Sequence, residues 1–294
     1  MLEYDYIIAG AGPAGAVAAY CLQRKGFKCL IVEKRNKIDE KICGGLLSGE
    51  AVAALSNIEL NAMELIDFGA TKINSFTRIK NGTPDVYCYP YGEYCLGLRR
   101  NYFDQWLLDK AVTYGADVMM GVNLKNVVED KSLFFLQDIY AKHLIIATGA
   151  ANCFGADRSL YDKQSIGISA QITGSTNLLY NSAYFFFIDN GYDYVWAIPN
   201  GENIWNIGIW LQKFQHNVME KFNLYYHLIL EKHFTDVTFI RPAHGALCGN
   251  TKVTYYPSVD CNYIGDAAGT NDHNTGEGLR QAIESAIYLS EKLW

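Results

Sequence analysis

The first 33 residues alternate apolar runs with glycines in an order that predicts strand, helix and strand. Residues 4–9 form a short apolar run, residues 10–15 form a glycine-rich turn, and residues 16–25 repeat apolar positions with helical period. Gly26 ends this helical pattern, and residues 29–32 form a second apolar run. The chain therefore opens with a predicted βαβ unit.

The glycines of this unit have the spacing GxGxxG, which is typical of a dinucleotide site. Gly10 allows the tight turn, Gly12 lets the backbone approach a pyrophosphate, and Gly15 lets helix and strand pack closely. Glu33 ends the second strand, where it can accept hydrogen bonds from a ribose. A plain glycine-rich turn would leave Glu33 unexplained. The predicted nucleotide-binding residues are Gly10, Gly12, Pro13, Ala14, Gly15, Glu33 and Lys34.

Two central stretches, residues 71–100 and 165–214, are rich in aromatic and β-branched residues and contain Asn-Gly pairs. They predict antiparallel strands of one sheet, and residues 219–234 predict a helix. Because alternate residues of a strand face opposite ways, an aromatic run such as residues 184–187 can serve a core and a pocket at once. Turns are expected at Asn81-Gly82, Asn190-Gly191 and Asn200-Gly201.

The last stretch returns to the pattern of the opening unit. Residues 261–264 predict a strand, Gly265 and Asp266 begin a loop, and a helix is expected from about Thr275 to the end of the chain.

Composition and charge exclude several classes of protein. Half of the 294 residues are apolar, so a folded chain is expected, and a net charge of -6 without a basic stripe argues against a nucleic-acid surface. The eight cysteines show neither a CxxC pair nor metal-ligand spacing, which favours a reducing cytoplasm and no metal site. No apolar run reaches the roughly 18 residues that a membrane helix requires.

Several segments resemble one family of flavoproteins. The GDAAG segment, residues 265–269, is similar to that of FAD-dependent oxidoreductases of the para-hydroxybenzoate hydroxylase type. The TGEG segment, residues 275–278, resembles the geranylgeranyl reductase family within them. EKICGG at residues 40–45 is similar to the family's KxCGG stretch, RRNYFDQWL at residues 99–107 to its RxxFDxxL helix, and YVWAIP at residues 194–199 to its YxWxFP motif.

The resemblance implies non-covalently bound FAD, with Asp266 at the ribityl chain and backbone amides around Gly276 and Gly278 at the pyrimidine edge of the flavin. It places the Cys43 segment close to the isoalloxazine. The further cofactor-binding residues that it implies are Cys43, Gly44, Gly45, Arg100, Thr148, Gly149, Gly265, Asp266, Thr275, Gly276 and Gly278, and the implied substrate pocket contains Tyr194, Trp196 and Pro199.

The chain departs from the family pattern at four places. Trp210 stands where the family has a glycine, Thr148 where an aspartate often stands, and His273 where a proline is common. The chain also stops at Trp294, whereas the reductases usually continue. Trp210 is therefore expected to fill space, and a segment that helps to enclose long substrates is expected to be missing.

The elements together predict an α/β chain, α+β overall, with a Rossmann-like FAD-binding domain and an inserted antiparallel-sheet substrate domain. Residues 1–67, 100–158 and 246–294 are assigned to the FAD-binding domain. Residues 68–99 and 159–245 are assigned to the substrate domain.

Three functions are compatible with this pattern. The first is an FAD-dependent reductase that transfers hydride to a carbon–carbon double bond of a largely apolar or aromatic small molecule. The second is an oxygen-using hydroxylase or halogenase of the same fold, and the third is a flavin-binding protein without turnover. Tyr194 stands where the WxWxIP motif of flavin halogenases has its first tryptophan, which favours the reductase. Only one GxGxxG is present, so NAD(P)H bound transiently or a small redox protein is the expected electron donor.

Two side chains are candidates for proton delivery. Cys43 stands beside two glycines that clear space for a planar ring, so it is expected to be a proton donor or a substrate-positioning group, and ordinary packing of a buried thiol is the competing interpretation. His273 precedes TGEG, and its imidazole can deliver a proton near neutral pH, unless it is simply an exposed loop histidine.

Overall fold

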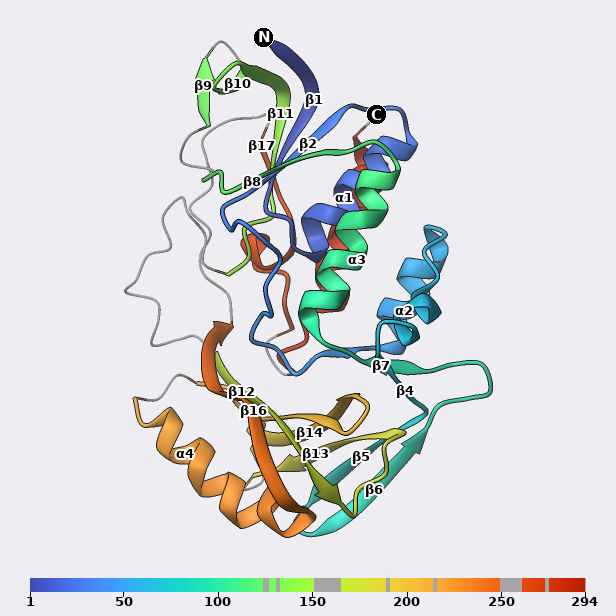
Figure 1. The fold of residues 1–294 in the computed structure, drawn as a ribbon, viewed down its shortest axis with the longest axis vertical. Helices are drawn as coiled ribbons and strands as arrows, with labels where there is room; N and C mark the ends of the chain where they lie inside the picture. The colour runs from blue at the N-terminus through green and yellow to red at the C-terminus, as the bar shows by residue number, and fades with distance from the viewer. Residues whose placement is uncertain are drawn as a thin grey trace.

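The computed structural model describes residues 1–123, 127–130, 133–150, 165–188, 191–213, 216–248, 261–272 and 275–293. Within these residues the chain forms two seven-stranded sheets and a small three-stranded sheet. Figure 1 shows the two large sheets at opposite ends of the molecule, with most helices beside the first. The fold is the predicted mixture of α/β and antiparallel parts, whereas the domain boundaries stay a prediction.

The first sheet contains the predicted βαβ unit. Its strands are β1 (Leu2–Ala9), β2 (Cys29–Glu33), β8 (Asp117–Met120), β9 (Val128–Asp130), β10 (Leu133–Leu136), β11 (Ile139–Ile146) and β17 (Cys261–Tyr263). The strand order is β8-β2-β1-β11-β10-β9, and β17 also pairs with β11. All pairings among β8, β2, β1, β11 and β17 are parallel, so the ends of these strands meet at one edge, where open α/β sheets bind ligands.

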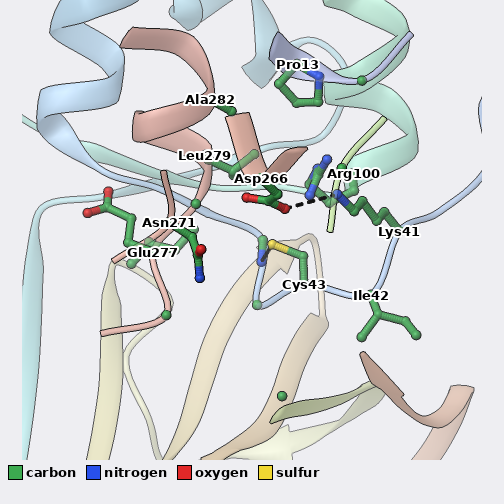
Figure 2. A pocket seen from close by; sticks show the side chains of 18 of the residues that line it. Pro13, Lys41, Ile42, Cys43, Arg100, Asp266, Asn271, Glu277, Leu279 and Ala282 are labelled. Atoms are coloured by element: carbon green, nitrogen blue, oxygen red, sulfur yellow. Dashed lines mark hydrogen bonds and ion pairs between the residues drawn. The ribbon is translucent and has the colours of Figure 1, made fainter. Parts of the chain in front are cut away.

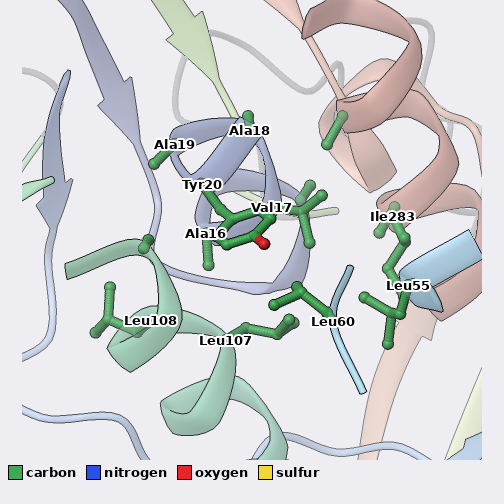
Figure 3. Close-up of a cluster of buried hydrophobic side chains, with 14 of the residues drawn as sticks. Ala16, Val17, Ala18, Ala19, Tyr20, Leu55, Leu60, Leu107, Leu108 and Ile283 are labelled. Carbon is green, nitrogen blue, oxygen red and sulfur yellow. The ribbon is translucent and has the colours of Figure 1, made fainter. Parts of the chain in front are cut away.

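Three helices pack together beside this sheet: α1 (Pro13–Arg24), α3 (Arg100–Thr113) and α5 (Leu279–Lys292). α1 carries small, fully buried residues that let its neighbours approach closely, among them Ala16, Ala18 and Ala19. Larger side chains such as Leu107 and Ile283 fill the space between the helices (Figure 3). Each such side chain contributes about 1.5–3 kcal/mol by leaving water. This core fixes the start of α1 against the end of β1.

The second sheet carries the aromatic stretches. Its strands are β5 (Ser75–Lys80), β6 (Thr83–Cys88), β12 (Ser165–Thr176), β13 (Ser182–Phe187), β14 (Tyr194–Gly201), β15 (Ile204–Leu211) and β16 (Phe234–Cys248), in the order β16-β12-β15-β14-β13-β5-β6. A three-stranded sheet of β3 (Leu46–Leu47), β7 (Cys95–Gly97) and β4 (Thr71–Ile73) adjoins β14. The remaining long helices are α2 (Gly49–Asn57) and α4 (Val218–Tyr225).

The structure corrects several of the sequence-based expectations about this sheet. Residues 71–100 do not all join it, because β4 and β7 belong to the small sheet. β5 pairs with β13 in parallel, since the connection between them runs through the first sheet and returns. The helix expected over residues 219–234 consists of α4, a π-helical turn (Tyr226–Leu230) and a 3₁₀ turn (Glu231–His233).

Asn200-Gly201 is not a turn, because both residues lie in β14 and the turn follows at residues 202–203. Asn190 of a further expected turn lies outside the described residues.

Candidate cofactor and substrate site

A pocket of about 1190 Å³ lies where the first sheet, the small sheet and the second sheet meet. Ligand pockets commonly enclose roughly 300–1,000 Å³, so this one has room for a large cofactor and a substrate together. Its walls come from segments far apart in the sequence, including the α1 turn, residues 41–46, residues 275–278 and strands β13 to β15.

The glycine-rich turn forms one end of the pocket. Gly10 has a φ of +111°, and a Cβ there would lie 2.4 Å from the Ala147 carbonyl oxygen. A Cβ at Gly15 would lie 1.9 Å from the Gly10 carbonyl oxygen, so helix and strand pack as closely as the spacing predicts. By contrast, a Cβ at Gly12 would meet no atom within 4 Å. Gly12 therefore faces open pocket at the N-terminus of α1, where amides and helix dipole favour a phosphate.

Glu33 lies at this end with its carboxylate already engaged. Glu33 Oε2 accepts the Ala11 N–H at 3.0 Å, and Oε1 accepts Arg35 Nε at 2.9 Å. Burial favours the neutral acid, but the hydrogen bonds from Arg35 and Ala11 outweigh it and hold the pKa of Glu33 below its ordinary value. The charged carboxylate braces the turn and lines the pocket beside Lys34.

Asp266 marks the middle of the pocket. It lies in a 3₁₀ turn (Gly265–Ala268) directly after β17, and a Cβ at Gly265 would lie 3.0 Å from the Ala14 Cβ at the start of α1. Lys41 Nζ approaches Asp266 Oδ2 at 3.8 Å (Figure 2). Thr148 and Gly149 line the same region, and the Thr148 hydroxyl has no hydrogen-bond partner among the described residues.

The predicted helix start at Thr275 is wrong, because α5 begins at Leu279. Residues 275–278 form a turn in which Gly276 has a φ of +71° and donates its N–H to the Asp272 carbonyl oxygen at 2.9 Å. This N–H is not free to face a flavin, contrary to the expectation. Thr275, Gly276 and Gly278 nevertheless line the pocket.

Cys43 lies opposite this turn, beside a buried ion pair. Arg100 Nε and Nη2 donate to the two carboxylate oxygens of Asp104 at 2.8 and 2.9 Å. Burial alone would lower the pKa of Arg100, but Asp104 and a hydrogen bond to Cys43 raise it above its ordinary value, so the guanidinium stays charged. The Gly45 N–H also points to Cys43 Sγ, at 3.4 Å. The sulfur therefore faces two donors.

Two buried asparagines hold the Cys43 loop from the other sheet, and sequence reasoning missed both. Asn206 Nδ2 donates to the Cys43 carbonyl oxygen at 2.8 Å, and its Oδ1 accepts Trp196 Nε1 at 2.8 Å. Asn200 Nδ2 donates to the Gly45 carbonyl oxygen at 3.0 Å. An asparagine inside an aromatic strand is the signal that could have identified them, because a buried amide needs partners.

Trp196 and Trp210 line the pocket beside Gly44 and Gly276, respectively. A Cβ at Gly276 would lie 2.8 Å from Trp210 Cζ3, and one at Gly208 would lie 2.1 Å from Trp196 Cζ2. Gly44 also faces the Trp196 indole, at 3.5 Å from an added Cβ. The two indoles rest directly on glycine backbone, and Trp210 fills space as its size predicts.

The remaining predicted site residues are placed as follows. Tyr194 lines the pocket and donates its hydroxyl hydrogen to the Thr275 carbonyl oxygen, which ties β14 to the TGEG turn. Pro199 is not among the lining residues, since its carbonyl oxygen packs against Gly97. His273 lies outside the described residues.

Comparisons with known proteins find related FAD-binding proteins and reductases. Residues 3–133 match the model of an FAD binding domain. Digeranylgeranylglycerophospholipid reductase 1 of Methanococcoides burtonii is 26% identical over 309 residues, which cover 98% of this chain and 74% of that protein. The corresponding reductase of Methanosarcina mazei is 25% identical over 319 residues, with 98% and 74% covered.

The chain is an FAD-dependent oxidoreductase that is similar to geranylgeranyl reductases over nearly its whole length.

Solved structures share the fold of this flavoprotein. A geranylgeranyl bacteriochlorophyll reductase-like protein of Thermoplasma acidophilum superimposes with a TM-score of 0.82 at 23% identity, covering 99% of this chain and 78% of that one. The flavin-dependent brominase Bmp2 has a TM-score of 0.79 at 19% identity, with 98% and 78% covered. None of the described helices is both long and apolar enough to cross a membrane.

FAD fits the residues present. The open space at Gly12, the charged carboxylate of Glu33 and the Thr148 hydroxyl, which has no partner among the described residues, all line a single pocket. They suit a pyrophosphate, a ribose and a polar chain, respectively.

Proposed function

We propose that this protein is a reductase that uses FAD to saturate a carbon–carbon double bond in a largely apolar substrate. The observation that supports it most directly is the indole-lined chamber of Trp196 and Trp210 beside Cys43 and the TGEG turn. Its two relatives above are named for a digeranylgeranylglycerophospholipid. A substrate with an unsaturated isoprenoid chain therefore suits both the chamber and the relatives.

The proposed cofactor-binding residues divide along the pocket. The α1 turn holds the pyrophosphate, and Glu33 with Lys34 faces the adenosine ribose, while Asp266 and Thr148 face the chain that joins pyrophosphate to flavin. Bound in this way, reduced FAD supplies the hydride. The chain itself orients the double bond, excludes water with the two indoles and provides the proton for the neighbouring carbon.

Cys43 is the proposed source of that proton. The saturated product needs one hydride and one proton on adjacent carbons, so proton delivery leaves a thiolate at Cys43. Arg100 and the Gly45 N–H already face the sulfur and stabilise this negative charge. The carbonyl hydrogen bonds from Asn206 and Asn200 hold the loop so that the thiol keeps its position.

We expect Cys43→Ala to retain FAD and to slow substrate-dependent reoxidation of the reduced enzyme by about 100-fold, in the range usual for a general acid. Cys43→Ser keeps a hydroxyl and should slow it less. Stopped-flow absorbance at the flavin band measures both rates. Cys88→Ser is the matched control, because Cys88 is an exposed cysteine of β6 outside the pocket lining. Wild-type rates in both Cys43 variants would mean that the Cys43 thiol packs in the pocket wall and does not deliver the proton.

The electron donor forms part of the proposal. NAD(P)H bound transiently, or a small redox protein, would reduce the enzyme, because the sequence has a single GxGxxG that the FAD site uses. The lack of CxxC pairs favours a reducing cytoplasm as its location.

Anaerobic turnover tests the reaction class. The photoreduced enzyme should be reoxidised without oxygen by a geranylgeranyl lipid, and the saturated product should be found by mass spectrometry. Reoxidation by oxygen alone, with a hydroxylated or halogenated product, would assign the oxygen-using chemistry instead. Stable reduced flavin with either acceptor would indicate a binding protein.

A further inference from the structure

Asn271 carries a buried amide that nothing in the described structure satisfies. Its residue is 7% exposed, and neither Oδ1 nor Nδ2 has a hydrogen-bond partner among the described residues. It lines the pocket, and Figure 2 shows it beside Glu277, below Asp266 and to the left of Cys43. Buried polar groups are normally paired, and an unpaired one is costly, so this amide calls for a ligand.

The position of Asn271 along the pocket narrows the choice of ligand. A Cβ at Gly278 would lie 3.2 Å from Asp266 Oδ1 and 3.7 Å from the Asn271 Cβ, so the two side chains flank Gly278. Asp266 in turn lies beside the start of α1 through the contact of Gly265 with Ala14. A dinucleotide with its ribose at Glu33 and its pyrophosphate at α1 must extend past Asp266, which brings its second half to Asn271.

The hydrogen-bonding pattern of that second half matches a carboxamide. The pyrimidine edge of an isoalloxazine presents an N–H between two carbonyl oxygens. Asn271 offers one acceptor and one pair of donors side by side. The Thr148 hydroxyl and the Trp210 indole, which also have no partner among the described residues, present a single polar atom each. The family resemblance assigns amides around Gly276 and Gly278 to this edge, and of these the Gly276 N–H already donates to the Asp272 carbonyl oxygen.

We propose that Asn271 recognises the pyrimidine edge of the flavin through its side-chain amide, donating from Nδ2 to a ring carbonyl oxygen and accepting the ring N–H at Oδ1. The donated bond strengthens as the ring gains negative charge, so Asn271 also stabilises the reduced flavin. The inference rests on FAD binding and is independent of the proposed substrate.

Two variants of Asn271 test the loss of its hydrogen bonds and the addition of a negative charge separately. Asn271→Leu removes both hydrogen bonds at nearly constant size and should weaken FAD binding about tenfold, as the loss of one or two buried bonds does. Asn271→Asp replaces the donor with a negative charge and should favour oxidised over reduced flavin by about tenfold, which is about 30 mV for a two-electron couple. Asn57→Asp, on an exposed residue at the end of α2, is the charge control.

The measurements are made without substrate. Titration of the apoprotein with FAD gives the dissociation constant, and equilibration with reference dyes gives the midpoint potential. Binding of 3-methyl-FAD, which lacks the ring N–H, completes a double-mutant cycle: it should bind more weakly than FAD to the wild type but not to Asn271→Leu. Circular dichroism of each apoprotein verifies folding.

Additive losses in this cycle would overturn the proposal, as would wild-type FAD affinity and potential in both variants. If FAD affinity and potential are unchanged but the substrate KM changes, Asn271 binds the substrate and not the flavin. If Asn271→Leu fails to fold, Asn271→Ser enters the same cycle, because its hydroxyl cannot pair with two atoms of the edge at once.

Discussion

Gly12→Val should give a folded protein that no longer retains FAD. Gly12 has a φ of −79°, which any residue adopts, and a Cβ there meets no atom within 4 Å. The valine side chain would therefore occupy pocket rather than protein, in the space where the pyrophosphate approaches the start of α1. We expect FAD affinity to fall by at least about 100-fold, since the phosphate loses its contact with the helix N-terminus.

Flavin absorbance after desalting, together with thermal melting of the apoproteins, measures this effect. Gly15→Ala is the informative contrast, because its Cβ would lie 1.9 Å from the Gly10 carbonyl oxygen. That variant should lower the melting temperature of the apoprotein, whereas Gly12→Val should leave it near the wild-type value. Stoichiometric FAD in Gly12→Val would mean that the cofactor lies elsewhere.

Asp104→Ala should destabilise the apoprotein by about 3–5 kcal/mol, the usual cost of leaving one member of a buried ion pair without its partner. The Arg100 and Asp104 side chains are 4% and 1% exposed, and Arg100 stays charged at neutral pH. Removal of the carboxylate leaves a buried guanidinium without its charged partner, beside the Cys43 sulfur. Urea unfolding of the apoprotein measures the loss of free energy.

Asp85→Ala is the control for this pair. Asp85 also pairs with an arginine, Arg78, but both side chains are more than half exposed. Its removal should therefore change the free energy of unfolding by less than about 1 kcal/mol. Equal effects of the two substitutions would mean that burial does not set the strength of the Arg100 pair.

The opening βαβ unit could be predicted from sequence because local rules determine it. Gly10 needs a positive φ, Gly15 needs a missing Cβ, and Glu33 follows at the end of the next strand. The start of α5 was mispredicted, although its cause is also local. Gly276 adopts a positive φ and donates its N–H to the Asp272 carbonyl oxygen, and the apolar pattern of the sequence reveals neither feature.

The features that the sequence did not predict depend on contacts between residues far apart in the chain. Asn200 precedes a glycine and therefore predicts a turn, yet β14 continues through it because its amide bonds the Gly45 and Leu98 carbonyl oxygens. The parallel pairing of β5 with β13 depends on the path of the chain through the first sheet, which alternation of residues does not encode. The unsatisfied amide of Asn271 becomes visible only when its surroundings are known.

The contact of the two indoles with glycine has a consequence for how this pocket can evolve. Gly208 and Gly276 cannot gain a side chain unless an indole moves, because the added Cβ would lie within 3 Å of Trp196 or Trp210. Replacing Trp210 with a smaller side chain meets no such steric obstacle. Substrate range can therefore change by single substitutions in one direction only, toward a larger chamber and bulkier substrates. The two glycines stay fixed even after an indole is shortened, because a Cβ at Gly208 would still lie 2.2 Å from the Ile168 carbonyl oxygen and Gly276 keeps a φ of +71°.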